Sequence, residues 1–300
     1  MTATATVERR SPVNDRVPDR RSSRHVSGSQ IAKYGVLLVA AFMALFPVLL
    51  IASTALRDPA EVRVDPFALF TSFTLESLQR AWTVGGFSAY FLNSVLLAVP
   101  STVLTVVLST GAGYAFARCR FRGRNLLFYV TTLGLLVPFF ALMIPLYFQL
   151  LQMGLLDTLV GAVLVLTASG AGGLSFGIFL MRSFFIDLPV ELEQAARVDG
   201  CSEWMIFRRV MLPLVRSGAA ALSVFTFLQN WNNFLVPLLY LPGGEYRALP
   251  SALYLFASGR TMEVGAVAAG VFITILPVIA VFVVAQRQLI RGFMSGAVKG

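Results

Sequence analysis

Residues 87–114 read FSAYFLNSVLLAVPSTVLTVVLSTGAGY, a run that contains no charged side chain. A helix needs about 20 consecutive, mostly apolar residues to cross the hydrocarbon core of a bilayer. This run is long enough to do so. It therefore predicts a membrane-spanning helix.

Five further apolar stretches of spanning length flank this run, at residues 31–56, 126–151, 158–181, 217–241 and 263–285. Four of them contain proline, and transmembrane helices tolerate proline where neighbours satisfy the freed carbonyls. The whole chain is 57% hydrophobic and 13% charged, whereas a soluble domain is about half apolar and about a quarter charged. We predict an all-α membrane protein with six transmembrane helices, several of them kinked.

The net charge of +9 could suggest a nucleic-acid partner, but the placement of the charge argues against one. Most Lys and Arg residues lie before the first stretch, after the second, between the fourth and fifth, or after the sixth. The remaining ones are Arg57, Arg63, Arg80, Arg247 and Arg260. By the positive-inside rule, the four cation-rich segments face the cytoplasm. Both termini are therefore predicted to be cytoplasmic, with no nucleic-acid partner.

The N-terminal segment differs from the rest of the chain in composition. Residues 1–30 are rich in Arg, Ser and Thr and show no hydrophobic periodicity, which is typical of disorder. We predict a disordered, basic cytoplasmic tail over 1–30 and a single transmembrane domain over 31–300. Cys119 and Cys201 both fall on the predicted cytoplasmic side, where thiols stay reduced.

The longest predicted cytoplasmic segment, about 183–216, contains two short helical patterns. Asp187 can cap a first helix with Pro189 in its first turn, and Gly200 is a natural terminator. Ser202 can cap a second helix over 203–211, which Pro213 would stop. One face of the first helix is expected to carry Leu188, Leu192, Ala195 and Ala196.

This pattern predicts an amphipathic helix-turn-helix at the cytoplasmic surface. A small apolar face with charges at its edges suits docking into a groove on another protein. The same face would also suit a surface helix that covers the chain's own bundle. The residues alone leave both interpretations open.

The same segment carries a motif with defined spacing. Gln194-Ala195-Ala196 is followed by Gly200 and then by Val210, Leu212 and Pro213. This resembles the signature of ABC importer permease subunits, which reads Glu-Ala-Ala, three residues, Gly, nine residues, Ile, one residue, Leu-Pro. The spacing agrees throughout. The departures are Gln194 in place of Glu, which removes a charge, and Val210 in place of Ile.

Similarity to carbohydrate-uptake permeases of the maltose type extends over roughly residues 31–300. It is carried jointly by Asn93-Ser94, by the run from Gly113 to Arg118, by Ile144-Pro145-Leu146-Tyr147, by Trp231-Asn232-Asn233-Phe234 and by the ending 292–300.

This resemblance implies a multi-pass permease of the bacterial inner membrane, surrounded by lipid, that forms half of a translocation path. Its implied partners are a sister permease, two ATP-binding-cassette ATPase subunits and an extracytoplasmic solute-binding protein. ATP and Mg²⁺ would be bound by the ATPases, so this chain would hold no cofactor or metal and would not be an enzyme. In agreement, its only lysines, Lys33 and Lys299, do not complete a phosphate-binding loop.

The resemblance also implies which residues dock the ATPase: Glu191, Glu193, Gln194, Ala195, Ala196, Asp199, Gly200, Leu212 and Pro213. The family's glutamate is expected to face a basic residue of the ATPase. Gln194 can donate and accept hydrogen bonds but cannot form an ion pair, so the charge contact would fall to Glu193 or Glu191.

The fifth apolar stretch carries a polar cluster, which consists of Gln229, Asn230, Trp231, Asn232 and Asn233. Amides beside an aromatic ring suit contact with an uncharged polyol along a substrate path. They equally suit interhelical hydrogen bonding, and both roles are compatible with the sequence.

Other functions make different demands on the sequence. A permease for another small solute, such as a polyol or glycerol phosphate, would share these motifs. A stand-alone secondary transporter would usually keep ionisable residues deep in the membrane, and the fifth and sixth stretches lack a central Asp or Glu. A non-transporting scaffold would need neither the polar cluster nor the spaced loop motif.

Overall fold

The computed structural model describes residues 28–168, 172–257 and 264–297. In these ranges the chain forms helices joined by turns and contains no β-strand. The predicted tail falls almost wholly on residues 1–27, outside the described ranges. The chain divides into two units, 1–47 and 48–300, and α1 (Gly28–Ala55) runs from the first into the second.

Fourteen further α-helices and one π-helical segment follow α1 in the described residues. They are α2 (Pro59–Val64), α3 (Glu76–Thr83), α4 (Phe87–Arg118), α5 (Arg124–Leu133), α6 (Phe139–Gln152), α7 (Leu159–Ala168), α8 (Leu174–Ile186), α9 (Glu191–Val198), α10 (Glu203–Met205), the π-helix η1 (Ile206–Met211), α11 (Leu212–Leu214), α12 (Arg216–Trp231), α13 (Leu235–Tyr240), α14 (Leu249–Ala257) and α15 (Val264–Ala297).

Three helices of the described residues are long and apolar enough to cross a membrane: Ala32–Ala55, Phe87–Arg118 and Val264–Gln286. A fourth span results if Glu203–Leu214 and Arg216–Trp231, which meet at an angle of 72°, are counted together. The membrane class is therefore confirmed, while the number six stays a prediction.

The other predicted spans are interrupted where the sequence disfavours a continuous helix. The stretch 126–151 divides into α5 and α6. Pro138, which precedes α6, has extended backbone (φ −67°, ψ 130°). Because proline has no N–H, it cannot donate the hydrogen bond that would continue a preceding helix. The stretch 158–181 divides into α7 and α8, and Gly173 precedes α8 with extended backbone. The stretch 217–241 divides at Asn232 into α12 and α13. Pro138 and Gly173 thus stand at two of the breaks, and Asn232 stands at the third.

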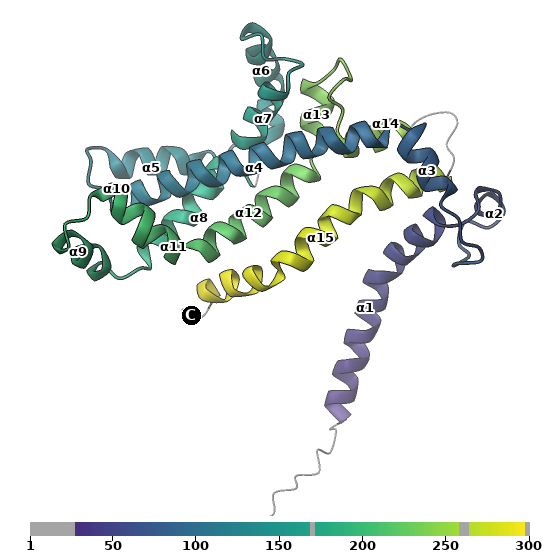
Figure 1. The fold of residues 1–300 in the computed structure, drawn as a ribbon, viewed down its shortest axis with the longest axis horizontal. Helices are drawn as coiled ribbons and strands as arrows, with labels where there is room; N and C mark the ends of the chain where they lie inside the picture. The colour runs from purple at the N-terminus through teal and green to yellow at the C-terminus, as the bar shows by residue number, and fades with distance from the viewer. Residues whose placement is uncertain (1–27, 169–171, 258–263, 298–300) are drawn as a thin grey trace, which may run out of the picture. The chain divides into compact units, whose positions relative to one another are not determined.

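Within the unit 48–300, α4 is the central element and packs against α7, α8 and α12, while α15 packs along α12 (Figure 1). Small residues permit the α4–α8 contact. A Cβ atom added to Gly113 would lie 2.8 Å from Met181 Cβ, and one added to Gly177 would lie 2.1 Å from Ser109 Oγ. Close approach of two helices through small residues is the typical packing mode inside membranes.

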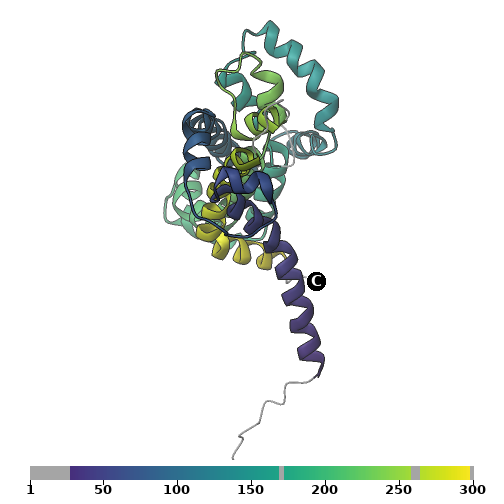
Figure 2. The ribbon, with the colours of Figure 1, turned by 90° about the vertical axis from the view of Figure 1, so that its right-hand side faces the viewer.

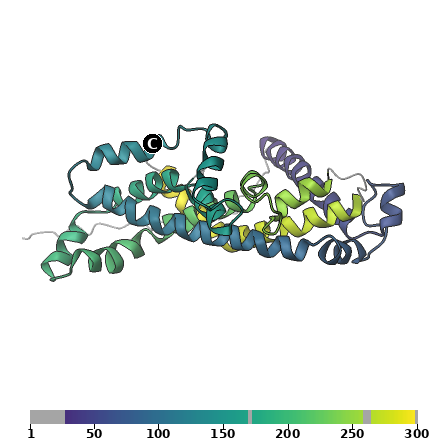
Figure 3. The same ribbon diagram turned by 90° about the horizontal axis from the view of Figure 1, so that it is seen from above.

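The motif Asn93-Ser94 attaches the segment after α13 to α4. The Asn93 amide donates to the carbonyls of Glu245 (3.0 Å) and Arg247 (3.2 Å), and Leu249 N–H donates to Ser94 Oγ at 2.8 Å. The helices α6 and α13 lie on the same side of α4 (Figure 2). Tyr240 of α13 donates to the Met143 carbonyl of α6 at 3.0 Å. The short helix α9 lies near the opposite end of α4 from α3 (Figure 3).

Candidate functional site

The helix α9 occupies the segment in which the loop motif was found, and its ends are defined by backbone geometry. It starts at Glu191 with Val190 as N-cap and no side-chain cap, so the prediction that Asp187 caps it is wrong. Asp187 instead ends α8, because Pro189 separates the two helices.

Gly200 terminates α9, as the sequence predicts. It has a φ of +78°, and the next residue, Cys201, donates its N–H to the Ala196 carbonyl at 3.0 Å while Gly200 N–H donates to the Arg197 carbonyl at 3.0 Å. These two bonds form a Schellman motif, in which the residue with positive φ is usually glycine.

The second helical segment begins at Glu203. Ser202 caps it, as predicted, by accepting a hydrogen bond from Met205 N–H at 3.4 Å. Pro213 does not stop the helix, because it occupies an early position of α11, where a missing N–H is tolerated. The chain bends after Leu214 instead, and α12 follows.

The buried side of α9 differs from the predicted one. Glu193 and Ala196 are buried, at 3% and 7% exposure, whereas Leu192 and Ala195 are exposed. The predicted apolar face is thus confirmed only in part: Ala196 is buried and Leu188 is half-buried, but Leu192 and Ala195 are not. The charged Glu193 side chain turns inward instead, toward its ion-pair partners.

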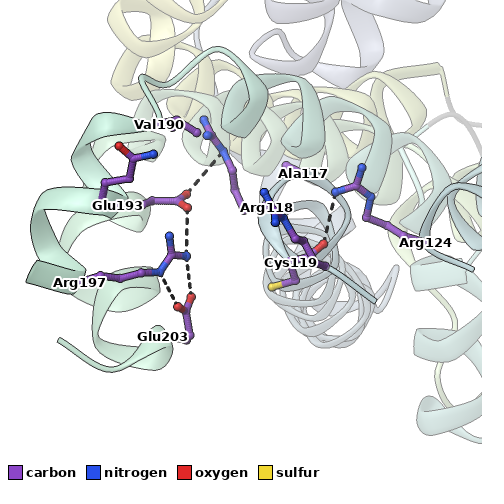
Figure 4. Close-up of a pocket in the computed structure, with 10 residues that line it drawn as sticks. Ala117, Arg118, Cys119, Arg124, Val190, Glu193, Arg197 and Glu203 are labelled. Carbon is purple, nitrogen blue, oxygen red and sulfur yellow. Dashed lines mark hydrogen bonds and ion pairs between the residues drawn. The ribbon is translucent and has the colours of Figure 1, made fainter. Parts of the chain in front are cut away.

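The reason for the burial of Glu193 is an ion-pair network (Figure 4). Glu193 lies 3.5 Å from Arg118 Nε and 3.6 Å from Arg197 Nη2. Arg197 also pairs with Glu203 at 2.7 Å. Arg118 further donates to the carbonyls of Phe185, at 3.0 Å from Nε, and Leu188. The network thus joins α4, the end of α8, α9 and α10.

The remaining predicted docking residues lie mostly at the surface. Glu191, Gln194, Ala195, Asp199, Gly200 and Pro213 are exposed, and Leu212 is half-buried. The exposed apolar side chains Val198 and Trp204 lie beside them in the sequence, at 87% and 68% exposure. Glu193 and Ala196 are the exceptions, because both are buried within their own chain.

A pocket of about 650 Å³ lies between the end of α4 and α9. It is lined by Ala117, Arg118, Cys119, Arg120, Arg124, Val190, Glu193, Gln194, Arg197 and Glu203. The hydrogen bond from Arg197 lowers the pKa of the Glu203 carboxyl, and the same bond raises the pKa of Arg197. Burial raises the pKa of the Cys119 thiol, which keeps it protonated. The described residues contain no cluster of His, Cys, Asp or Glu that could hold a metal ion.

The polar cluster of the fifth stretch divides into packed and exposed members. Asn230 is buried and donates to Ser101 Oγ of α4 at 2.9 Å, and Trp231 Nε1 donates to the Thr274 carbonyl of α15 at 3.0 Å. Gln229 and Asn232 are exposed, and Asn233 accepts from Val236 N–H at 3.0 Å. Asn230 and Trp231 therefore join helices, which leaves Gln229, Asn232 and Asn233 more accessible.

The sequence interpretation missed Arg118 as a site residue, although it lies within a quoted motif. The available signal was a single arginine at the end of a spanning helix, followed by Arg120, Arg122 and Arg124. Nothing in local spacing shows that its partner lies on α9, far along the chain.

Membrane-length apolar helices, broken shorter ones and a surface helix attached to the end of one span define a multi-pass membrane protein. The chain belongs to the family of binding-protein-dependent transport system inner membrane components, whose model matches residues 109–293. It is therefore an inner-membrane, permease-type component of an ABC importer.

Named relatives agree with this assignment. The chain is 34% identical to the diacetylchitobiose uptake system permease protein NgcG of Streptomyces coelicolor, over 88% of this chain and 87% of that protein. It is 35% identical to the lactose transport system permease protein LacG of Rhizobium radiobacter, over 90% and 96%.

The fold also matches a solved structure. The crystal structure of a bacterial ABC transporter involved in the import of the acidic polysaccharide alginate superimposes with a TM-score of 0.78 at 25% identity. The match covers 88% of this chain and 98% of that chain.

Proposed function

We propose that this chain is the permease subunit of an ATP-driven carbohydrate importer. The observation that carries the proposal is the match along most of the chain to permeases named for diacetylchitobiose, lactose and, at 33% identity, arabinooligosaccharide transport. In this proposal the chain and a sister permease form the path, and an external binding protein delivers the sugar. Two separate ATPase subunits hydrolyse ATP.

The ATPase is proposed to dock on α9 and the turn that follows it. The exposed residues Glu191, Gln194, Asp199 and Gly200 support this, because they project from a short helix with a rigid C-terminal cap. Exposed Val198 and Trp204 supply apolar contact area, and tryptophan is a frequent anchor at protein interfaces. Glu193 is not part of the proposed contact, because it is buried within the chain.

The proposed topology has six spans with both termini in the cytoplasm. The asymmetry of Lys and Arg between alternate loops supports it. The broken helix pairs α5–α6, α7–α8 and α12–α13 would then each supply one crossing. A phosphatase that is active only outside the cytoplasm, fused after Gly300, should be inactive. Phosphatase activity of this fusion would overturn the topology.

Along the path, Gln229, Asn232 and Asn233 are the proposed sugar contacts. They are the members of the polar cluster whose side chains are exposed or half-buried, and amides donate to and accept from hydroxyl groups. Asn230 and Trp231 are assigned to helix packing.

The substrate class is tested by uptake in a strain that lacks this chain. Radiolabelled mono- and oligosaccharides, a polyol and glycerol phosphate are supplied to the deletion strain and to the strain complemented with the intact chain. Loss of uptake for at least one carbohydrate, restored by complementation, is expected. Loss confined to glycerol phosphate or to a non-carbohydrate solute would contradict the proposal.

A further inference from the structure

The carboxylate of Glu193 is unusual within this molecule. Among the described residues, Glu193 and Arg57 are the charged residues that are buried, and Glu193 is the acidic one. Removing a carboxylate from water is unfavourable unless it is paired, and a buried ion pair is often no more stable than an apolar pair of similar volume. The burial of Glu193 therefore calls for an explanation other than stability.

The geometry around Arg118 supplies one. Arg118 is the last residue of α4, and its side chain is 8% exposed. From this position its planar guanidinium reaches the Phe185 carbonyl in the last turn of α8, the Leu188 carbonyl in the linker, and Glu193 on α9. A cation at the C-terminal end of a helix also interacts favourably with the helix dipole, which favours the contact with α8.

The contact with α9 depends mainly on charge. Glu193 Oε1 lies 3.5 Å from Arg118 Nε and makes no hydrogen bond. Arg118 has fixed carbonyl partners on its α8 side and a charge partner on its α9 side. A displacement of α9 would therefore act on the end of α4 through one side chain.

We propose that Arg118 and Glu193 are positioning residues that transmit movement between α9 and the spanning helix α4 during transport. The inference rests on the proposed docking of an ATPase on α9. A pair with a purely structural role would affect the amount and thermal stability of the complex, but it would leave the number of solute molecules moved per ATP unchanged.

The test uses the complete importer, with both permeases and the ATPases, reconstituted in liposomes together with its binding protein. Glu193→Gln removes the charge but keeps the size and leaves Arg118 its carbonyl partners. Arg118→Lys keeps the charge but cannot reach three partners with one planar group. The matched control is Glu76→Gln, which removes one half of a surface Glu–Arg pair 3.8 Å apart in which both side chains are half-exposed.

Three quantities are measured for each variant: ATPase retained on purification, ATP hydrolysed and solute transported. We expect Glu193→Gln and Arg118→Lys to retain the ATPase and to transport about fivefold less solute per ATP, which is the scale of coupling changes along such contacts. Glu76→Gln should match the wild type in all three. If Glu193→Gln does not yield a stable complex, Arg118→Lys decides the outcome.

The results separate this inference from the proposed function. Failure of the wild-type permease to retain any ATPase would overturn the docking proposal itself. Retention of the ATPase by the variants with wild-type transport per ATP would overturn only the positioning role. Loss of the ATPase from both variants but not from the wild type would also overturn it, because the pair would then belong to the docking surface.

Discussion

Two arginines whose side chains are at most 8% exposed lie at the ends of apolar helices in this molecule, and they stabilise different parts of the fold. Arg57 follows α1 and is 1% exposed. It donates to Thr71 Oγ1 (2.8 Å) and to the carbonyls of Asp65 (3.0 Å) and Ala68 (2.9 Å), all within 14 residues in the sequence. Arg118 ends α4, and its carbonyl partners are 67 and 70 residues away.

The two arginines also differ in their acidic partners. Glu61, 3.8 Å from Arg57, is 45% exposed and accepts from the hydroxyls of Thr71 and Ser72. The Glu193 side chain is 4% exposed and lies between Arg118 and Arg197. Arg57 therefore stabilises a single loop by hydrogen bonds within it, whereas Arg118 joins separate helices. The local contact orders a loop at small entropic cost, and the long-range contact connects a proposed docking helix to a span.

The largest expected effect comes from Arg118→Met. The substitution leaves Glu193 buried beside Arg197 alone and removes the donor from two carbonyls. Breaking a buried pair by removing one partner costs about 3–5 kcal/mol. We expect a large fall in the thermal unfolding midpoint of the detergent-solubilised protein, and partial recovery when Glu193→Gln is added.

The same substitution at Arg57, Arg57→Met, tests whether the local contact behaves differently from the Arg118 contact. It should cost about 1–3 kcal/mol for the unpaired carbonyls, with faster amide hydrogen exchange confined to residues 57–74. Adding Glu61→Gln should recover little, because Glu61 is exposed and is solvated when Arg57 is removed. Equal recovery in both double variants would mean that the two arginines are equivalent after all.

The second prediction concerns the cap that fixes α9. Gly200 has a φ of +78°, and no atom lies within 4 Å of a Cβ added to it, so Gly200→Val would strain the backbone without a clash at Cβ. A left-handed conformation costs a residue with a side chain about 1–2 kcal/mol. We expect normal membrane insertion with reduced ATPase retention and transport.

Gly154 provides a control with the same geometry elsewhere. Its φ is +68°, and it too has open space around the added atom. Gly154→Val should therefore introduce similar strain while ATPase retention stays normal. If both variants lose the ATPase equally, strain alone accounts for the effect and α9 has no special role.

Local chemistry predicted much of this structure, and long-range contacts set the rest. Three of the apolar stretches, the Gly200 terminator and the Ser202 cap follow from residue type and spacing, and the structure confirms them. Hydrophobicity alone does not predict the breaks within three stretches, which fall at Pro138, at Gly173 and at Asn232. The burial of Glu193 could not be predicted, since its partner Arg118 is brought to it only by the α4–α8 packing.

The third prediction tests the exposed residue that follows Glu193 on α9 and lines the same pocket as Arg118. Gln194 is exposed and lies at the rim of the arginine-lined pocket. Gln194→Glu restores the charge found in the family signature. We expect tighter ATPase binding by less than about 1 kcal/mol, the usual range of exposed ion pairs, and a gain that shrinks as salt is added.

Binding of the solubilised permease pair to its ATPase, measured across salt concentrations, checks this prediction. Weaker binding would show that the ATPase presents no basic residue there. Unchanged affinity and salt slope would place position 194 outside the contact, and the role implied by the family signature would have to be given up.

The smallest expected effect is the response of the two networks to acid. Hydrogen bonds from Thr71 and Ser72 lower the pKa of Glu61 below its ordinary 4.5, and the hydrogen bond from Arg197 does the same for Glu203. A carboxyl whose pKa is lower in the folded state contributes stability above its unfolded pKa and loses it as the pH falls through the folded value. Both contributions should therefore be constant above about pH 5 and decline below pH 4.5.

The measurement is the difference in unfolding midpoint between wild type and Glu61→Gln, and separately Glu203→Gln, across this range. Because both side chains are largely exposed, each difference should be small and should shrink on acidification. A difference that stays constant to low pH would show that the carboxylate charge contributes nothing at that site, and the Arg57 loop would then be held by its hydroxyl and carbonyl contacts alone.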